Sequence, residues 1–87
     1  MSQPPVTMYA SNWCPYCTRA RELMLKKGLS FHEIDVDDAA GTRAEMIERS
    51  GRRTVPQIFV GDRHIGGCDD LAALDDSGEL DRLIQGV

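Results

Sequence analysis

The 87-residue chain contains no apolar run that approaches the ~18 residues of a membrane-spanning helix. Its first eight residues, MSQPPVTM, have neither a basic segment nor an apolar stretch of the kind that marks export. Repeats, low-complexity segments and linkers are also missing, and the length suits one domain with a single core. We therefore expect a single domain over residues 1–87, located in the cytoplasm and making no membrane contact.

Positive charge is in the minority, with 10 Lys and Arg against 14 Asp and Glu, which gives a net charge of −4. Binding to phosphates favours a basic face, so nucleic acid is not expected as a partner. Cysteine is scarce as well, with three residues. Three thiols in a reducing cytosol do not form a structural disulfide framework, which leaves redox catalysis as the better explanation for them.

Two of the three thiols lie in Cys14-Pro15-Tyr16-Cys17, where they can close and reopen a small disulfide ring. A predicted strand, Val6 to Ala10, precedes the motif, and a helical pattern from Thr18 to Lys27 follows it. Cys14 should therefore lie at a helix N-terminus, where the macrodipole favours a thiolate. We expect Cys14 to be the nucleophile, and Cys17, one turn into the helix, to be the more buried resolving thiol with the higher pKa.

The third cysteine and the two histidines are expected to play no part in this chemistry. A zinc half-site is the alternative interpretation of the paired thiols, but zinc takes four ligands and only Cys68 is left over, so no metal site is expected. Acidic residues follow Cys68, which favours a packed, non-catalytic thiol. His32 and His64 fall in predicted strands and are interpreted as surface or cross-strand residues.

Short apolar runs alternate with helical patterns along the rest of the chain, which predicts an α/β protein with the element order βαβαββαα. Further strands are expected at 31–36, 57–60 and 63–65, the last two joined by a Gly61-Asp62 turn. Further helices are expected from a capping box at Thr42–Glu45 to Ser50, from Asp69 onward, and from Glu79 to Gln85. The residues expected in the core are the methionines with Leu23, Leu71, Leu74, Leu80 and Leu83.

Three motifs then support a resemblance. Cys14-Pro15-Tyr16-Cys17, Thr54-Val55-Pro56 and Gly66-Gly67-Cys68-Asp69-Asp70, in this order and spacing, resemble those of dithiol glutaredoxins, and the resemblance covers nearly the whole chain. It implies a thioredoxin-like fold, with a four-stranded mixed sheet flanked by helices. It also implies glutathione-dependent reduction of protein–glutathione mixed disulfides and of protein disulfides. Glutathione would be the reducing co-substrate, no cofactor would be bound permanently, and a monomer would act on client proteins.

The resemblance also implies a glutathione site. Val55 and Pro56 would be joined by a cis bond that turns the backbone of Val55 toward Cys14, so that glutathione can pair with it like an added strand. A helix N-terminus after Gly67 would hold the γ-glutamyl carboxylate, and Asp69 or Asp70 would hold the ammonium. The glutathione-binding residues implied in this way are Tyr16, Arg43, Arg53, Thr54, Val55, Pro56, Gly67, Cys68 and Asp69. Taken singly, these features have plainer interpretations as a packing aromatic, a strand-initiating proline, an Asp-capped helix and solvated arginines.

Two residues depart from the family pattern. Ser11 stands where many glutaredoxins have a lysine, which removes a cation that would favour the thiolate, and Trp13 is similar to the tryptophan of thioredoxins. Two alternative functions stay open. One is a dimer that holds a [2Fe–2S] cluster through two Cys14 thiolates and two glutathiones, which Pro15 and Cys17 disfavour. The other is a redoxin recharged by thioredoxin reductase, which the implied glutathione site disfavours.

Overall fold

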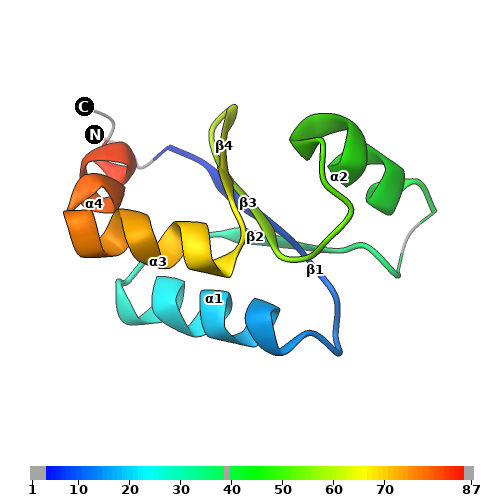
Figure 1. Ribbon diagram of the computed structural model, residues 1–87, viewed down its shortest axis with the longest axis horizontal. Helices are drawn as coiled ribbons and strands as arrows, with labels where there is room; N and C mark the ends of the chain where they lie inside the picture. The colour runs from blue at the N-terminus through cyan, green and yellow to red at the C-terminus, as the bar shows by residue number, and fades with distance from the viewer. Residues whose placement is uncertain (1–3, 39, 86–87) are drawn as a thin grey trace.

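The computed structural model describes residues 4–38 and 40–85 of the chain, and within them the elements follow in the predicted order βαβαββαα (Figure 1). Met1, which was expected in the core, lies outside the described residues. None of the helices in the described ranges is both long and apolar enough to cross a membrane. The strands and helices are β1 (Val6–Ala10), α1 (Pro15–Lys26), β2 (His32–Asp35), α2 (Thr42–Ser50), β3 (Gln57–Val60), β4 (Arg63–Gly66), α3 (Cys68–Ser77) and α4 (Glu79–Ile84).

The strands form one four-stranded mixed sheet, as the resemblance implies, and their order in it is β2-β1-β3-β4. β1 runs parallel to β2 and antiparallel to β3, and β3 and β4 form an antiparallel hairpin. The hairpin turns at Gly61 and Asp62, where the φ of +58° at Gly61 suits a residue without a Cβ. The fold prediction is confirmed.

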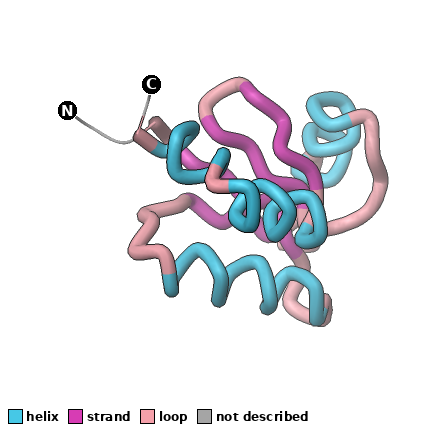
Figure 2. Tube along the Cα trace, turned by 60° about the vertical axis from the view of Figure 1, so that its left-hand side comes forward, coloured by secondary structure: helices cyan, strands magenta, loops and turns pink. Residues whose placement is uncertain are grey.

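Helices cover both faces of the sheet (Figures 1 and 2). Side chains along a strand alternate between faces, so Met8 and Ala10 point to one side of β1 while Tyr9 points to the other. The first face packs against α1, α3 and α4 through a large apolar cluster that contains Met24, and all five expected leucines lie in or against this cluster. The second face packs against α2, where Tyr9, Val36, Met46 and Phe59 form a smaller cluster.

The start of α2 differs from the prediction. Gly41, with a φ of +89°, is the N-cap, and Thr42 is already helical, so the expected Thr42–Glu45 capping box is wrong. The carboxylate of Glu45 instead accepts a hydrogen bond from the Tyr9 hydroxyl, and the Arg49 guanidinium donates to the Tyr9 hydroxyl oxygen at 2.9 Å. A buried phenol needs polar partners, and α2 supplies them from its sheet-facing side.

α1 and α3 begin slightly earlier than their apolar patterns indicate, whereas α4 begins at Glu79 as expected. α1 begins at Pro15, with Cys14 as its N-cap, and Gly28, in a left-handed conformation, follows its end. α3 begins at Cys68, after Gly67 as N-cap, rather than at Asp69. At the C-terminal end of α1, the Lys27 ammonium pairs with Asp75 at 2.8 Å and with Asp81 at 2.7 Å, which joins α1 to α3 and α4.

Candidate active site

Cys14 lies at the N-terminus of α1, half-buried, where the chain has just left β1. Its sulfur accepts a hydrogen bond from the backbone N–H of Cys17 at 3.2 Å. Its thiol also donates to the carbonyl oxygen of Val55 at 3.5 Å. The N–H contact and the positive end of the helix dipole both favour negative charge on this sulfur. The position therefore suits a thiol that must act as a nucleophile.

Cys17 is fully buried, one turn into α1. Burial, followed by a hydrogen bond with Cys14, raises the pKa of Cys17 to about 12. All three cysteines are free thiols. Because a buried thiol with this pKa stays protonated at neutral pH, the geometry favours attack by Cys14 and resolution by Cys17.

Cys68 packs half-buried against the same apolar cluster that Cys14 contacts. Burial and the neighbouring Asp69 carboxylate raise the pKa of the Cys68 thiol. A protonated thiol is a poor nucleophile, which agrees with the expected non-catalytic role.

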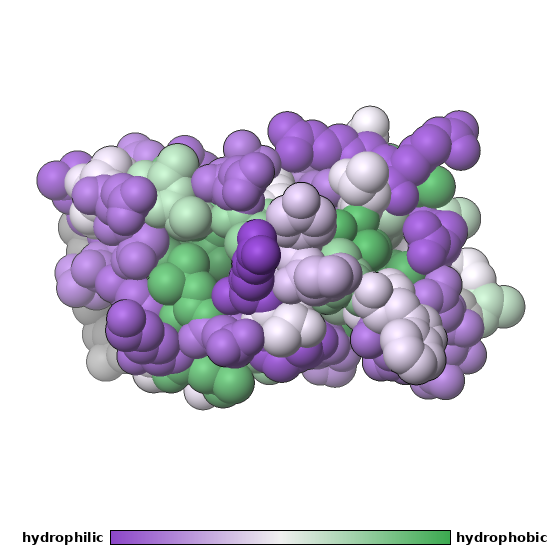
Figure 3. All heavy atoms as spheres, turned by 60° about the horizontal axis from the view of Figure 1, so that its bottom comes forward, coloured by the Kyte–Doolittle hydropathy of each residue, from purple (hydrophilic) through white to green (hydrophobic). Residues whose placement is uncertain are grey.

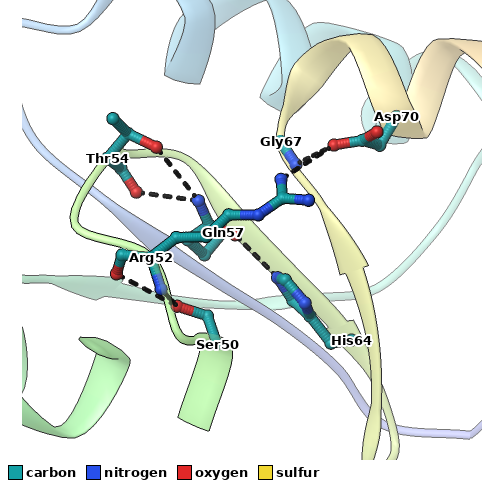
Figure 4. A network of polar contacts seen from close by, with 7 residues as sticks. All are labelled: Ser50, Arg52, Thr54, Gln57, His64, Gly67 and Asp70. Atoms are coloured by element: carbon teal, nitrogen blue, oxygen red, sulfur yellow. Dashed lines mark hydrogen bonds and ion pairs between the residues drawn. The ribbon is translucent and has the colours of Figure 1, made fainter. Parts of the chain in front are cut away.

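The segment before β3 supplies one wall of the site. The Val55–Pro56 bond is cis, as the resemblance implies, and the Val55 carbonyl points to Cys14. The backbone of this segment packs closely against the start of α3. A Cβ added to Gly67 would lie 3.4 Å from the carbonyl oxygen of Pro56. Behind it, the side chain of Gln57 hydrogen-bonds to Thr54 on one side and to His64 on the other (Figure 4).

The start of α3 supplies the opposite wall. Asp70 accepts a hydrogen bond from the Gly67 N–H at 2.9 Å and pairs with the Arg52 guanidinium at 3.1 Å (Figure 4). These two contacts, the N–H first, lower the pKa of the Asp70 carboxyl. Gly66 has a φ of +117°, and a Cβ there would lie 2.3 Å from the Asp70 carboxylate oxygen. The carboxylate therefore takes the space that any larger residue at position 66 would need.

Between the two walls lies a pocket of about 280 Å³. It brings together most of the residues implied by the resemblance, and three that were not in that set. The implied residues that line it are Tyr16, Thr54, Val55, Pro56, Gly67, Cys68 and Asp69. The additional lining residues are Arg52, Gln57 and Asp70, of which Asp70 was considered for the ammonium. Arg52 could have been found from the sequence, because it lies in a cluster of arginines, whereas no sequence pattern points to Gln57.

The two arginines that the resemblance implies, Arg43 and Arg53, do not line this pocket. Arg43, on α2, is exposed and pairs with Asp37 at 3.0 Å. Arg53 is exposed beside the pocket-lining Thr54. Their contact with glutathione stays a prediction.

Two aromatic rings are presented to solvent near the cysteines. Trp13 is 92% exposed and Tyr16 is 53% exposed, and the Arg19 guanidinium lies 5.5 Å from the centre of the Tyr16 ring. On the side of the molecule shown in Figure 3, hydrophilic side chains surround limited apolar areas. The exposure of Tyr16 leaves it available to flank a molecule in the pocket.

A pair of thiols at a helix N-terminus, on a four-stranded mixed sheet flanked by helices, defines a thiol-disulfide oxidoreductase of thioredoxin-like fold. The glutaredoxin family model matches residues 6–65. The chain is 51% identical over 81 residues to a glutaredoxin of Pseudomonas aeruginosa, covering 93% of this chain and 96% of the relative. It is 56% identical over 80 residues to glutaredoxin 3 of Escherichia coli K12, covering 92% and 96%.

Solved structures agree with these matches. The solution structure of glutaredoxin from Brucella melitensis has a TM-score of 0.85 and 54% identity, covering 97% of this chain and 91% of that one. A buckwheat glutaredoxin–glutathione complex has a TM-score of 0.87 and 29% identity, covering 97% and 78%. The chain belongs to the glutaredoxin family.

Proposed function

We propose that this glutaredoxin uses glutathione to reduce protein–glutathione mixed disulfides and protein disulfides. The observation that carries the proposal is the pocket of about 280 Å³ whose walls are the Val55 segment, in contact with Cys14, and the start of α3. The family match supports it, as does the likeness to a buckwheat glutaredoxin that was solved in complex with glutathione.

Glutathione is an extended tripeptide with two carboxylates and one ammonium, and residues in and around the pocket offer a partner for each part. The backbone of Val55 can pair with the peptide as an added strand would. The N–H groups at the start of α3 suit the γ-glutamyl carboxylate, and the exposed carboxylate of Asp69 suits the ammonium. Arg53, exposed beside the pocket-lining Thr54, or Arg43 on α2 would meet the glycine carboxylate. Asp70 already has two partners, so Asp69 is the better candidate for the ammonium.

In the one-thiol route, the Cys14 thiolate attacks the glutathionyl sulfur of a protein–glutathione mixed disulfide. A bond forms between Cys14 and glutathione, and the client sulfur leaves as a thiolate that takes up a proton. The thiolate of a second glutathione then attacks the glutathione sulfur of this mixed disulfide. The products are oxidised glutathione and free Cys14.

In the two-thiol route, Cys14 attacks a protein disulfide and forms a mixed disulfide with the client. Cys17 then gives up its proton and attacks Cys14, which releases the client dithiol and closes the Cys14–Cys17 bridge. Two glutathione molecules reduce this bridge in turn and leave as oxidised glutathione. We propose that the protein works in this way as a cytoplasmic monomer, with no nucleic acid partner and no permanently bound cofactor.

The test is the glutathione-coupled reduction of a small mixed disulfide, with glutathione reductase and NADPH supplying electrons. The expected result is NADPH consumption that depends on glutathione and vanishes in Cys14→Ser. Turnover with thioredoxin reductase in place of glutathione and its reductase would favour the redoxin alternative. Visible absorbance in a dimer after anaerobic purification would favour the [2Fe–2S] alternative.

A further inference from the structure

Besides the Tyr9 phenol and the Cys17 thiol, Gln57 is the one polar side chain that is fully buried in the described part of the chain, at 1% exposure. Its neighbours along β3 are the apolar Ile58, Phe59 and Val60, all buried. Burying an amide is unfavourable unless its donors and acceptor all find partners. An apolar residue would fill this strand position without that requirement, so the partners of Gln57 indicate what the amide does.

The amide of Gln57 joins a loop to the sheet through three contacts (Figure 4). Its nitrogen donates to the Thr54 carbonyl oxygen at 3.0 Å and lies 3.2 Å from the Thr54 hydroxyl oxygen. Its oxygen lies 2.7 Å from Nε2 of His64, which is on the neighbouring strand β4. Every polar atom of the side chain is therefore used.

These partners leave a single orientation for the amide. The Thr54 carbonyl can only accept a hydrogen bond, so the amide nitrogen must face it. The amide oxygen then faces His64, whose Nε2 must carry a hydrogen. The His64 ring is itself held by Phe59, with the two ring centres 5.0 Å apart. The Thr54 carbonyl therefore excludes the flipped amide, and His64 supports the remaining orientation by donating from Nε2 to the amide oxygen.

The loop that Gln57 holds carries the wall of the active site. Residues 52–54 are exposed, and Thr54, Val55 and Pro56 line the pocket. Val55 also carries the carbonyl that meets Cys14. A contact from the interior of the sheet to an otherwise exposed loop fixes the position of the backbone with which glutathione would pair.

We propose that Gln57 is a positioning residue for glutathione, which holds the Thr54–Val55 backbone in its binding position, and that His64 supports it by donating a hydrogen bond to its amide oxygen. This rests on the proposed glutathione-dependent function and adds to it a residue of the pocket lining, Gln57, with its partner His64 outside that lining. Neither side chain contacts the reacting sulfur. Their effect should therefore appear in selectivity for glutathione rather than in the reactivity of Cys14 toward any disulfide.

The experiment measures that selectivity at equilibrium. Protein with Cys17→Ser, which cannot close the internal bridge, is placed in redox buffers of glutathione or of 2-mercaptoethanol, and the mixed disulfide at Cys14 is counted by mass spectrometry. In this background Gln57→Leu should lower the equilibrium constant for the glutathione adduct by about tenfold, as expected for the loss of a buried hydrogen-bonding partner. The constant for the mercaptoethanol adduct should not change.

Val60→Ala is the matched control, because Val60 is buried on the same strand and lines no part of the pocket. It should lower the melting temperature without changing selectivity. Equal losses for both adducts in Gln57→Leu, or unchanged selectivity, would overturn the positioning role. If the Cys17→Ser parent shows no preference for glutathione over mercaptoethanol, the proposed function itself fails, which is a distinguishable result.

Gln57→Glu keeps the shape of the side chain and serves if Gln57→Leu does not fold. An ionised carboxylate would put an oxygen against the Thr54 carbonyl, whereas a protonated one can donate to it. The charged groups that act on His64 beside it are Arg52 and Asp70. Measured against the Cys17→Ser parent at each pH, selectivity in Gln57→Glu should be low at neutral pH and recover on acidification. A deficit that does not vary with pH, or no deficit, would contradict the proposal.

Discussion

The thiol of Cys14 lies 3.5 Å from the carbonyl oxygen of Val55, although 41 positions separate the two residues in the sequence. The sheet explains the meeting. β1 and β3 are antiparallel and Tyr9 pairs with Gln57, so the last residues of β1 and the first residues of β3 lie at the same end of the sheet. The chain leaves β1 toward Cys14 and enters β3 from Pro56, which brings the thiol and the loop together.

Loss of Cys17 should separate the two reduction routes. A mixed disulfide needs one enzyme thiol, whereas reduction of a protein disulfide needs the bridge that Cys17 closes. Cys17→Ser should therefore keep or raise deglutathionylation activity and lose most protein disulfide reduction, while Cys14→Ser loses both. The measurement is the glutathione-coupled rate on each substrate. A folded Cys17→Ser protein that lost both activities would show that Cys17 does more than resolve.

The pKa of about 12 at Cys17 predicts that this thiol ionises only in strongly alkaline solution. In a Cys14→Ser, Cys68→Ser variant, the thiolate absorbance should appear only at a pH well above the ordinary cysteine pKa of ~8.5, because burial disfavours the charged form. The counterpart with Cys14 as its single thiol should be alkylated faster by iodoacetamide at neutral pH. Ionisation of Cys17 at or below ~8.5 would contradict the assignment of roles.

Asp69→Ala and Arg53→Ala should each weaken the use of glutathione by ~1–3 kcal/mol, the range for losing a charge-assisted hydrogen bond. The Arg43→Ala effect should be smaller, because Arg43 already pairs with Asp37. Arg82→Ala, in α4, is the control and should have no effect. The measurement is the dependence of rate on glutathione concentration. No change in the Asp69 and Arg53 variants would make these residues ordinary surface charges.

Gly66→Ala should disturb the pocket through Asp70. The new Cβ would lie 2.3 Å from the Asp70 carboxylate, so that side chain must leave its contacts with the Gly67 N–H and with Arg52. Gly61→Ala also places alanine at positive φ, but a Cβ there meets nothing within 4 Å. Both variants should lose ~1–3 kcal/mol of stability from backbone strain. Only Gly66→Ala should also weaken glutathione binding, and equal kinetics in the two variants would refute this.

His64 should make the protein less stable in mild acid. Burial, and then the charge of Arg52, lower the pKa of His64 from its ordinary value of 6.5. Between the lowered value and 6.5, the unfolded chain binds more protons than the folded one, so the free energy of unfolding falls as pH drops through that window. The difference between the wild type and His64→Gln, followed by circular dichroism between about pH 7 and 5, should show this loss. His32→Gln, at an exposed position, should behave like the wild type.

Much of this architecture could be predicted because local patterns determine it. The Gly61-Asp62 turn, the glycine after α1 and the spacing of the leucines each depend on a few neighbouring residues. The polar contacts behind the pocket could not be predicted, because they depend on register. Gln57 meets His64 across a hairpin whose register shifts between Ile58 and Phe59, and nothing in the sequence marks that irregularity. The capping box failed for a similar reason, since Tyr9, far away in the sequence, engages Glu45.

Trp13 is the only tryptophan of the chain and is 92% exposed, next to Cys14. Its indole is surrounded by solvent in the folded protein much as it would be in the unfolded chain. Intrinsic fluorescence is therefore a poor reporter of denaturation here. Because Trp13 is next to Cys14 in the sequence, its fluorescence emission can respond to a change in the oxidation state of the Cys14 sulfur. Quenching when the Cys14–Cys17 bridge closes would give a label-free optical titration of the redox state in a protein that stays folded throughout.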